Sequence, residues 1–141
     1  TSSYRIFGTS AGFYHGISGV ITSSETVYLI DYINNVSTPQ SGVPSITSKI
    51  GKDTLIIMSV SPNGDSTFWV NGQKYTGTWN RSISTFNASY PFSILGAGYS
   101  GSQAGTKIKS FSFGSGTLTD TQAENIRQFY STRHETTVYN A

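Results

Sequence analysis

A length of 141 residues fits one domain built around one core. Aromatic residues make up 13% of the chain and charged residues only 11%, which excludes a disordered segment, because such segments lack aromatics and carry a high net charge. The lack of cysteine excludes disulfides and thiolate metal sites, the net charge of +2 without a Lys/Arg run argues against a nucleic-acid partner, and no apolar run approaches the roughly 18 residues that membrane insertion needs.

The first part of the chain predicts short strands separated by turns. Residues 4–7 form a short strand candidate, residues 12–20 alternate weakly, and residues 26–33 predict a well-formed strand. Residues 34–44 contain Asn-Asn, two Pro and a Gly, a composition typical of a loop. Residues 53–60 are almost continuously apolar, which predicts a central strand that is covered on both faces.

The clearest local pattern is a hairpin in the middle of the chain. Residues 61–65, Ser-Pro-Asn-Gly-Asp, predict a turn, and residues 66–70 predict the strand that follows it. Asn71-Gly72 then supplies two residues that tolerate the positive φ of a type I′ turn, so residues 73–78 are expected to return as the partner strand.

The last part of the chain predicts two more strands and one helix. The strands are expected at residues 90–96 and 107–114, with a Gly-rich loop at 97–105 between them. The helix start has a cap at Thr119, a capping-box partner at Gln122, and a staple from Leu118 onto Ala123. The apolar positions that follow at helical spacing are Ala123, Ile126, Phe129 and Tyr130.

Three segments in this order resemble the laminin-G/concanavalin-A-like jelly-roll superfamily. They are strand 53–60 with its Asn63-Gly64-Asp65 turn, hairpin 66–73, and strand 108–113 with the helix start 118–123; residues 92–96 fit the apolar strand that the family places before the last of these. The resemblance covers about residues 53–130 and departs from the family where Gln122-Ala123 stands in place of Glu-Ile. It implies that residues 1–141 form one all-β domain, an antiparallel jelly-roll β-sandwich with one short helix on its C-terminal side. The first strands of a full member are not recognisable, so either the sandwich is compact or strands come from upstream sequence or a neighbouring subunit.

The same resemblance implies binding rather than catalysis, since most members of the superfamily bind glycans or proteins through loops or a concave sheet face. The cysteine-free composition, rich in Ser, Thr, Gly, Asn and Tyr, resembles modules of phage tail fibres, tailspikes and bacterial adhesins. We therefore expect part of a larger protein on an extracellular or virion surface, and the start at Thr1 fits an excised domain.

The candidate ligand-binding residues are aromatic and polar side chains in loop-like surroundings. Aromatic rings stack on the C–H faces of sugars, while amide and guanidinium groups bond to sugar hydroxyls. The candidates are Trp79, Asn80, Arg81, Tyr99, Tyr75, Tyr90, Tyr32 and Trp69. The alternative for each ring is a position that partly covers the core and leaves the polar end in water.

Trp69 has two alternative placements, because side chains alternate along a strand. If Phe68 and Val70 face the core, Trp69 lies on an exposed sheet face, where it would be a ligand platform or a subunit contact. In the opposite register Trp69 belongs to the core.

Calcium is the only ion for which the sequence offers ligands. Asn63, Asp65 and Asp31 have the oxygen donors that calcium prefers. A plain turn is the favoured explanation of Asn63-Gly64-Asp65, so calcium is possible but no cofactor is predicted.

Catalytic patterns are missing from the sequence. No Glu-x-Asp-x-x-Glu strand motif of the superfamily's glucanases occurs, and no Gly-x-Ser-x-Gly elbow precedes a helix. Asp120 and Glu124 are explained by their place near the N-terminus of the predicted helix.

These observations lead to three hypotheses. The first is a non-catalytic module that binds a glycan or a cell-surface receptor. The second is a structural piece of a fibre, such as a spacer or a homotrimer-forming element, with Trp69 and the missing edge buried between subunits. The third is a polysaccharide-degrading domain.

Overall fold

A computed structural model describes residues 4–8, 16–21, 26–33, 36–39, 45–46, 52–78, 93–94, 107–137 and 139. Within these ranges the chain forms eight strands and one helix, so β-sheet predominates as predicted. The expected Gly-rich loop 97–105 lies outside the described residues.

The first sheet is built from the N-terminal strands and one short late strand. They are β1 (Tyr4–Gly8), β2 (Gly16–Ile21), β3 (Val27–Ile33), β4 (Val36–Pro39) and β8 (Ser93–Ile94). Their order in the sheet is β4-β3-β2-β1-β8, and every neighbouring pair is antiparallel. Gly19 stands opposite Phe7, whose ring occupies the space that a Cβ at position 19 would need.

Strand β4 corrects the expectation of a loop over residues 34–44. Residues 36–39 pair with β3, and Pro39 stands opposite Ile30. Proline lacks the N–H that a central strand must donate, but an edge strand tolerates it. Because β4 is the outermost strand of this sheet, the proline that favoured a loop in the sequence is compatible with pairing here.

The second sheet contains β5 (Ile56–Val60), β6 (Asp65–Val70) and β7 (Gln73–Thr78), in that order and antiparallel. The predicted turn 61–65 joins β5 to β6. Ser61 N–H donates to the Asp65 carbonyl at 2.7 Å, Gly64 N–H donates to the Ser61 carbonyl at 3.0 Å, and Gly64 has a φ of 93°. This is the three-residue hairpin loop in which a type I turn is followed by a left-handed glycine.

The Asn71-Gly72 hairpin is confirmed, and Asn71 has a second role that the turn pattern does not require. Val70 pairs with Gln73, and the two turn residues have φ values of 49° and 88°, as a type I′ turn demands. Asn71 is 2% exposed and makes two hydrogen bonds with Leu55: its N–H donates to the Leu55 carbonyl at 2.9 Å, and its Oδ1 accepts from the Leu55 N–H at 2.8 Å. The turn of one hairpin thus fixes the chain that enters β5.

The predicted helix is confirmed as α1 (Asp120–Arg133). Thr119 is the N-cap: its hydroxyl accepts from the Gln122 N–H at 3.2 Å, and the Gln122 side chain accepts from the Thr119 N–H at 2.8 Å. Both halves of the predicted capping box are therefore present, and they satisfy two backbone donors that the helix itself leaves free.

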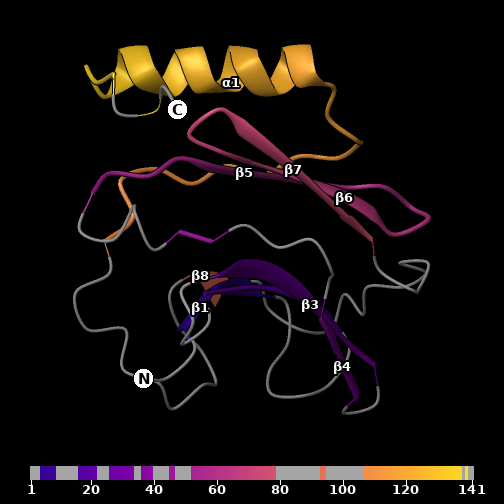
Figure 1. The fold of residues 1–141 in the computed structure, drawn as a ribbon. Coiled ribbons are helices and arrows are strands. Elements are labelled where there is room, and N and C mark those ends of the chain that lie inside the picture. The colour runs from indigo at the N-terminus through magenta and orange to yellow at the C-terminus, as the bar shows by residue number, and fades with distance from the viewer. Residues whose placement is uncertain are drawn as a thin grey trace.

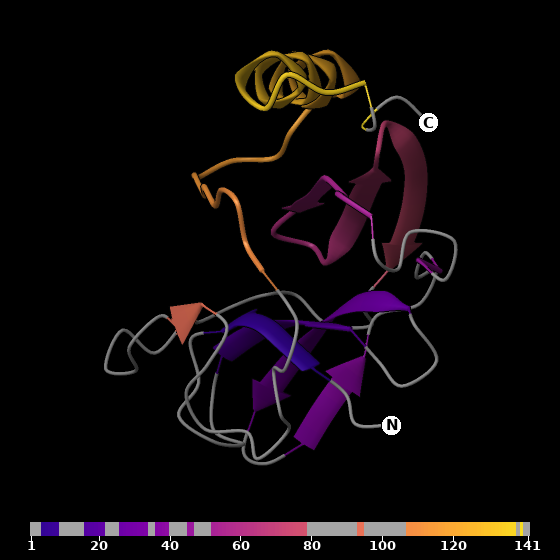
Figure 2. The same ribbon diagram turned by 90° about the vertical axis from the view of Figure 1, so that its left-hand side faces the viewer.

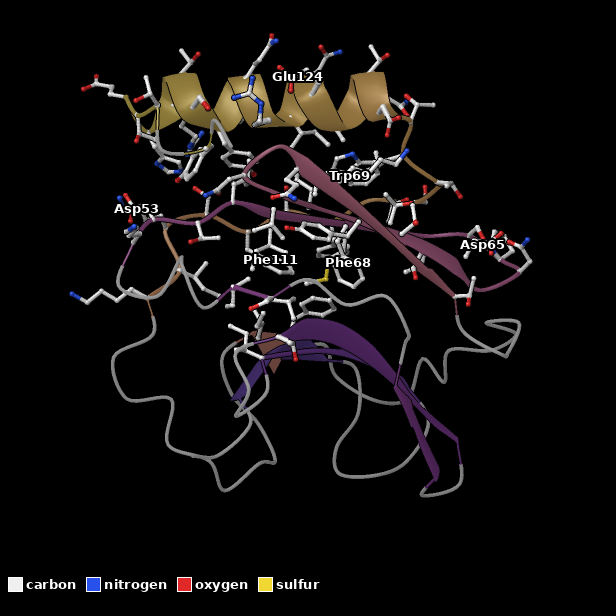
Figure 3. The ribbon with its side chains drawn as sticks, viewed as in Figure 1. Asp53, Asp65, Phe68, Trp69, Phe111 and Glu124 are labelled. Carbon is white, nitrogen blue, oxygen red and sulfur yellow. The ribbon has the colours of Figure 1, made fainter. Side chains whose placement is uncertain are left out.

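The two sheets and α1 form three layers, with the second sheet in the middle (Figure 1; Figure 2). On one face of the second sheet, Phe68 and Val70 pack with Val27 and Ile46 of the N-terminal part. On the other face, Trp69 and Ile57 pack with Ala123 of α1, joined by Leu55, Leu118 and Ile126. Strand β6 is consequently buried on both sides (Figure 3).

Trp69 therefore differs from the expectation of an exposed sheet face. Phe68 and Val70 do face the core between the sheets, but Trp69 on the opposite side is only 5% exposed. The physical reason is α1, which covers that face, so both arrangements considered from the sequence were incomplete.

The strand predicted at residues 107–114 is wrong, since none of these residues belongs to a strand. The segment runs beside β5 in the same direction: Lys109 forms an ion pair with Asp53, and further on the Leu118 N–H donates to the Ser59 hydroxyl at 2.8 Å. Each of these contacts involves at least one side chain, and residues 107–114 make no strand pairing with β5.

The double hydrogen bond of Asn71 predicts a measurable loss of stability on substitution. We expect Asn71→Ala to lower the free energy of unfolding by about 2–4 kcal/mol, because it removes the acceptor of a part-buried N–H and places alanine at a positive φ. Asn71→Gly is the matched variant, since glycine tolerates the φ and loses only the hydrogen bond. Urea unfolding followed by circular dichroism measures both. If neither variant is less stable than the unsubstituted chain, the contact with Leu55 has no structural role.

Candidate functional site

Most of the binding residues predicted from the sequence cannot be placed. Trp79, Asn80, Arg81, Tyr90 and Tyr99 all lie outside the described residues, so their roles stay predictions.

Two predicted tyrosines lie in strands. The backbone of Tyr32 belongs to β3, opposite Gly16 and Ser37. Tyr75 belongs to β7 and pairs with Phe68 of β6. Its side chain is half-buried and packs against the cluster that contains Phe68 and Val70. The ring of Tyr75 therefore partly covers the core. This is the placement that the sequence offered as the alternative to a binding role.

The proposed calcium ligands are engaged within their own turn. The Asn63 amide donates to Asp65 Oδ2 at 2.9 Å, and the Ser61 hydroxyl bonds to Asn63 Oδ1. Asp31 belongs to β3 of the other sheet. No group of three His, Cys, Asp or Glu residues that could hold a metal occurs among the residues that the structure describes. The turn itself accounts for the side chains at 61–65.

The described residues bring together a different set of side chains, at the C-terminal end of α1. Ser112 Oγ lies 2.9 Å from the Tyr130 hydroxyl, and Ser110 Oγ lies 3.2 Å from His134 Nε2. The two serines lie before α1 in the sequence, whereas their partners lie at its C-terminal end. The helix therefore runs back over segment 107–113. We call Phe113, Phe129, Tyr130 and His134, with the two serines, the aromatic strip.

Three rings of the aromatic strip, those of Phe129, Tyr130 and His134, are in contact along α1. Phe129 meets Tyr130 edge-on, with ring centroids 5.2 Å apart, and Tyr130 stacks on His134 at 5.9 Å with an angle of 11° between the rings. His134 in turn meets the buried Tyr139 edge-on at 6.2 Å. These contacts, with the hydrogen bonds to the two serines, hold the rings of Tyr130 and His134 in place.

Two phenylalanines of the aromatic strip are left in solvent. Phe113 is 80% exposed and Phe129 is 57% exposed, and they are the large hydrophobic side chains that stand out at the described surface. Phe113 contacts Phe111 at 6.2 Å, and Phe111 reaches the ring of Phe7 at 5.8 Å. Phe113, Phe111 and Phe7 thus form a second series of ring contacts, from segment 107–113 to β1.

An ion pair flanks the aromatic strip. Lys109 binds Asp53 through its ammonium group, and this hydrogen bond raises the pKa of Lys109 above its ordinary value. Nearby, burial raises the pKa of the Tyr139 hydroxyl, and the Asp53 carboxylate adds to the effect. The Lys109 and Asp53 charges beside the aromatic strip are thus paired with each other.

The other end of α1 is tied to the hairpin through Asp120. Lys74 Nζ lies 2.8 Å from the carboxylate, and the pKa of Asp120 is lowered chiefly by this hydrogen bond, with a smaller contribution from the Trp69 indole. The indole N–H of a buried tryptophan normally needs such a partner. Asp120 therefore links the start of α1 to both β6 and β7.

A second acidic residue is bound within α1 itself. Arg127 donates to Glu124 from Nε at 2.7 Å and from a terminal nitrogen at 2.5 Å, and Gln128 donates to the same carboxylate at 2.8 Å. The hydrogen bond from Arg127 is the main reason why the pKa of Glu124 falls to about 2. Figure 3 shows Glu124 on the outer side of α1.

The pair Ser110–His134 invites comparison with a nucleophile and its base. Such a pair needs a third group that orients the histidine, and donors for the developing oxyanion. No carboxylate among the described residues lies within ion-pair distance of His134, and the ring is instead held by stacking on Tyr130. The contact therefore fixes segment 107–113 against α1.

The aromatic strip was not predicted from the sequence. Phe129 and Tyr130 were assigned to the apolar helix face, and Phe113 to a strand. Two signals point to it in retrospect: the spacing of Tyr130 and His134, which puts their rings one helical turn apart, and the alternation of Ser and Phe over residues 110–113.

The lowered pKa of Glu124 predicts an acid-sensitive contribution to stability. A carboxyl whose pKa is depressed in the folded chain stabilises it fully above the ordinary value of 4.5, and this contribution is lost as the pH falls toward about 2. Glu124→Gln should therefore lower the unfolding midpoint at pH 7 and make no difference near pH 2. Arg127→Gln should remove the same pH dependence, because it deletes the partner. A pH series of thermal melts followed by circular dichroism tests this; equal differences at pH 7 and pH 2 would exclude the ion pair as the cause.

Comparisons with protein-family models, with curated proteins and with solved structures find no match to this chain. The resemblance to the laminin-G/concanavalin-A-like superfamily therefore stays a prediction. Within the described ranges, α1 lacks the length and hydrophobicity of a helix that crosses a bilayer.

Proposed function

We propose that this chain is a non-catalytic binding module that recognises glycans at an extracellular or virion surface. One observation carries the proposal: Phe129 is 57% exposed and contacts Tyr130, whose hydroxyl is hydrogen-bonded to Ser112, and Phe113, the next residue after Ser112, is 80% exposed. Exposed aromatic side chains of this size that lie beside polar groups mark interaction sites more often than isolated surface residues do.

The chemistry of the aromatic strip suits a sugar. A pyranose ring presents C–H groups on its faces and hydroxyls at its edges, so it needs a flat apolar surface with hydroxyl partners next to it. Phe129 offers the flat surface, and the adjacent Tyr130 and Ser112 offer hydroxyls that can donate or accept. These hydroxyls are already oriented by one another, which reduces the entropy lost on binding.

The proposal includes the fold of a jelly-roll β-sandwich. Two antiparallel sheets that pack through Phe68 and Val27 support it, as does the hairpin order of β5, β6 and β7. In such a sandwich the loops after β7 and around β8 would form a second contact surface, with the sequence-predicted residues Trp79, Asn80, Arg81, Tyr90 and Tyr99.

The two alternatives have less support. The fibre hypothesis needed Trp69 as a subunit contact, but α1 covers Trp69 within the chain. The enzyme hypothesis needs two carboxylates that face one substrate. Asp120 and Glu124 are bound to Lys74 and Arg127, and Asp53 and Asp65 lie at opposite ends of the second sheet (Figure 3).

A glycan array tests the proposal. We expect signal from the unsubstituted chain and a loss of about thirtyfold in affinity in Phe113→Ser with Phe129→Ser, since each of the two stacked rings contributes on the order of 1 kcal/mol. Phe129→Tyr should retain binding because it keeps the ring, and Thr132→Ala on the exposed side of α1 is the matched control.

Two results would change the proposal. An array without signal, together with a trimer in light scattering, would favour the structural role. Signal that survives the two Phe substitutions but disappears in Trp79→Ala or Tyr99→Ala would move the site to the loops predicted from the sequence.

A further inference from the structure

The last turn of α1 carries a cation beside the rings of the aromatic strip. Arg133 is the final residue of α1 and is exposed. Residues three and four apart in a helix are neighbours on its surface, with Cβ atoms about 5–6 Å apart. Arg133 follows Tyr130 by three residues and Phe129 by four, so it adjoins both side chains of α1 on which the proposed glycan site depends.

The two arginines of α1 differ in their partners. Arg127 donates two hydrogen bonds to Glu124 and is held in an ion pair with it. Arg133 forms neither an ion pair nor a side-chain hydrogen bond with any residue that the structure describes. Its guanidinium group keeps its charge at any physiological pH and has five N–H donors in a planar fork. The whole fork of Arg133 is thus open to an anionic ligand.

The backbone that carries Arg133 is fixed by the way in which α1 ends. The Glu135 N–H donates to the Thr132 carbonyl at 3.2 Å. The Thr136 N–H donates to the Ser131 carbonyl at 3.0 Å, and Glu135 has a φ of 49°, which together make a Schellman motif. The motif satisfies carbonyls that an open helix end leaves free, so it reduces the partial negative charge that an anion meets there.

The charges beside the aromatic strip favour an anion. The ion pair of Lys109 with Asp53 has no net charge. Lys107, two residues before it, and Arg133 are exposed cations without an ion-pair partner in the described part of the chain. Glu135 is the one carboxylate next to them that is likewise unpaired there. The remaining excess of positive charge attracts an anionic ligand, most strongly at low ionic strength.

From these observations we infer that the glycan bound by the aromatic strip is acidic: one of its sugar rings stacks on Phe129, and the carboxylate of that sugar accepts two hydrogen bonds from Arg133. A guanidinium group and a carboxylate are both planar and match in such a bidentate pair. A carboxylate attached directly to a sugar ring lies at a fixed distance from it, so stacking on Phe129 brings it within reach of a side chain one helical turn away. The inference rests on the proposed function and specifies the ligand class of the same site.

Matched pairs of glycans test this inference. Each pair consists of a glycan with a uronic acid and the same glycan with that carboxylate reduced to an alcohol, so the two members differ only in the acidic group. We expect the unsubstituted chain to bind the acidic member about tenfold more tightly at low salt, because hydrogen bonds between charged partners are the stronger ones. Added salt should reduce this preference, since it screens the exposed charges.

Three variants assign the preference to one side chain. Arg133→Gln should bind both members of a pair equally, with the affinity that the unsubstituted chain has for the neutral member. Arg133→Lys should keep part of the preference, because lysine retains the charge but lacks the planar fork. Lys52→Gln is the matched control: it removes one exposed positive charge outside the aromatic strip and should keep the tenfold preference. Circular dichroism verifies that each variant retains its helix.

The inference and the proposed function fail in different ways. Equal binding of both members of a pair by the unsubstituted chain, or a preference that survives in Arg133→Gln, would contradict the inference and leave glycan binding intact. Tighter binding of sulfated than of carboxylated glycans would contradict the assignment of the anion as a carboxylate. A lack of signal from every glycan, neutral or acidic, would instead contradict the proposed function.

Discussion

Strand β6 has large apolar side chains on both of its faces, and the rest of the structure depends on covering them. Phe68 and Val70 need one apolar layer and Trp69 needs another. A three-stranded sheet with one polar face needs only one apolar layer packed on it. The second sheet has two apolar faces, so it has to be the middle of three layers. The N-terminal sheet and α1 are the two layers that meet this need (Figure 1).

The backbone of the second sheet is fixed by the residues in its two hairpin turns. Asn71 accepts a positive φ and at the same time satisfies both backbone groups of Leu55. Gly64 completes the other hairpin with a second positive φ. Both turns fix the register of their hairpins, and the alternation of side chains along β6 puts Phe68 and Trp69 on opposite faces.

Elements with local chemistry could be predicted, and elements that depend on distant contacts could not. The hairpin at 66–78 and the capping box at Thr119 follow from neighbouring residues, and both are present. Strand β4 depends on its place at the edge of a sheet, and the segment 107–114 depends on which side chains α1 and β5 offer to it. The burial of Trp69 together with Phe68 was not predicted, because no local pattern tells which face of a strand a later helix will cover. The aromatic strip was missed for the same reason, since it joins residues on two elements.

The placement of α1 thus decides whether Trp69 is a core residue or an exposed surface for a ligand. It also determines which other aromatic rings remain exposed. Intrinsic fluorescence of a Trp79→Phe variant measures it directly, because Trp69 is then the only tryptophan. The structure predicts blue-shifted emission that acrylamide quenches weakly and that moves to longer wavelength on unfolding in urea. Emission that already matches the unfolded chain under native conditions would contradict the burial of β6 on both faces.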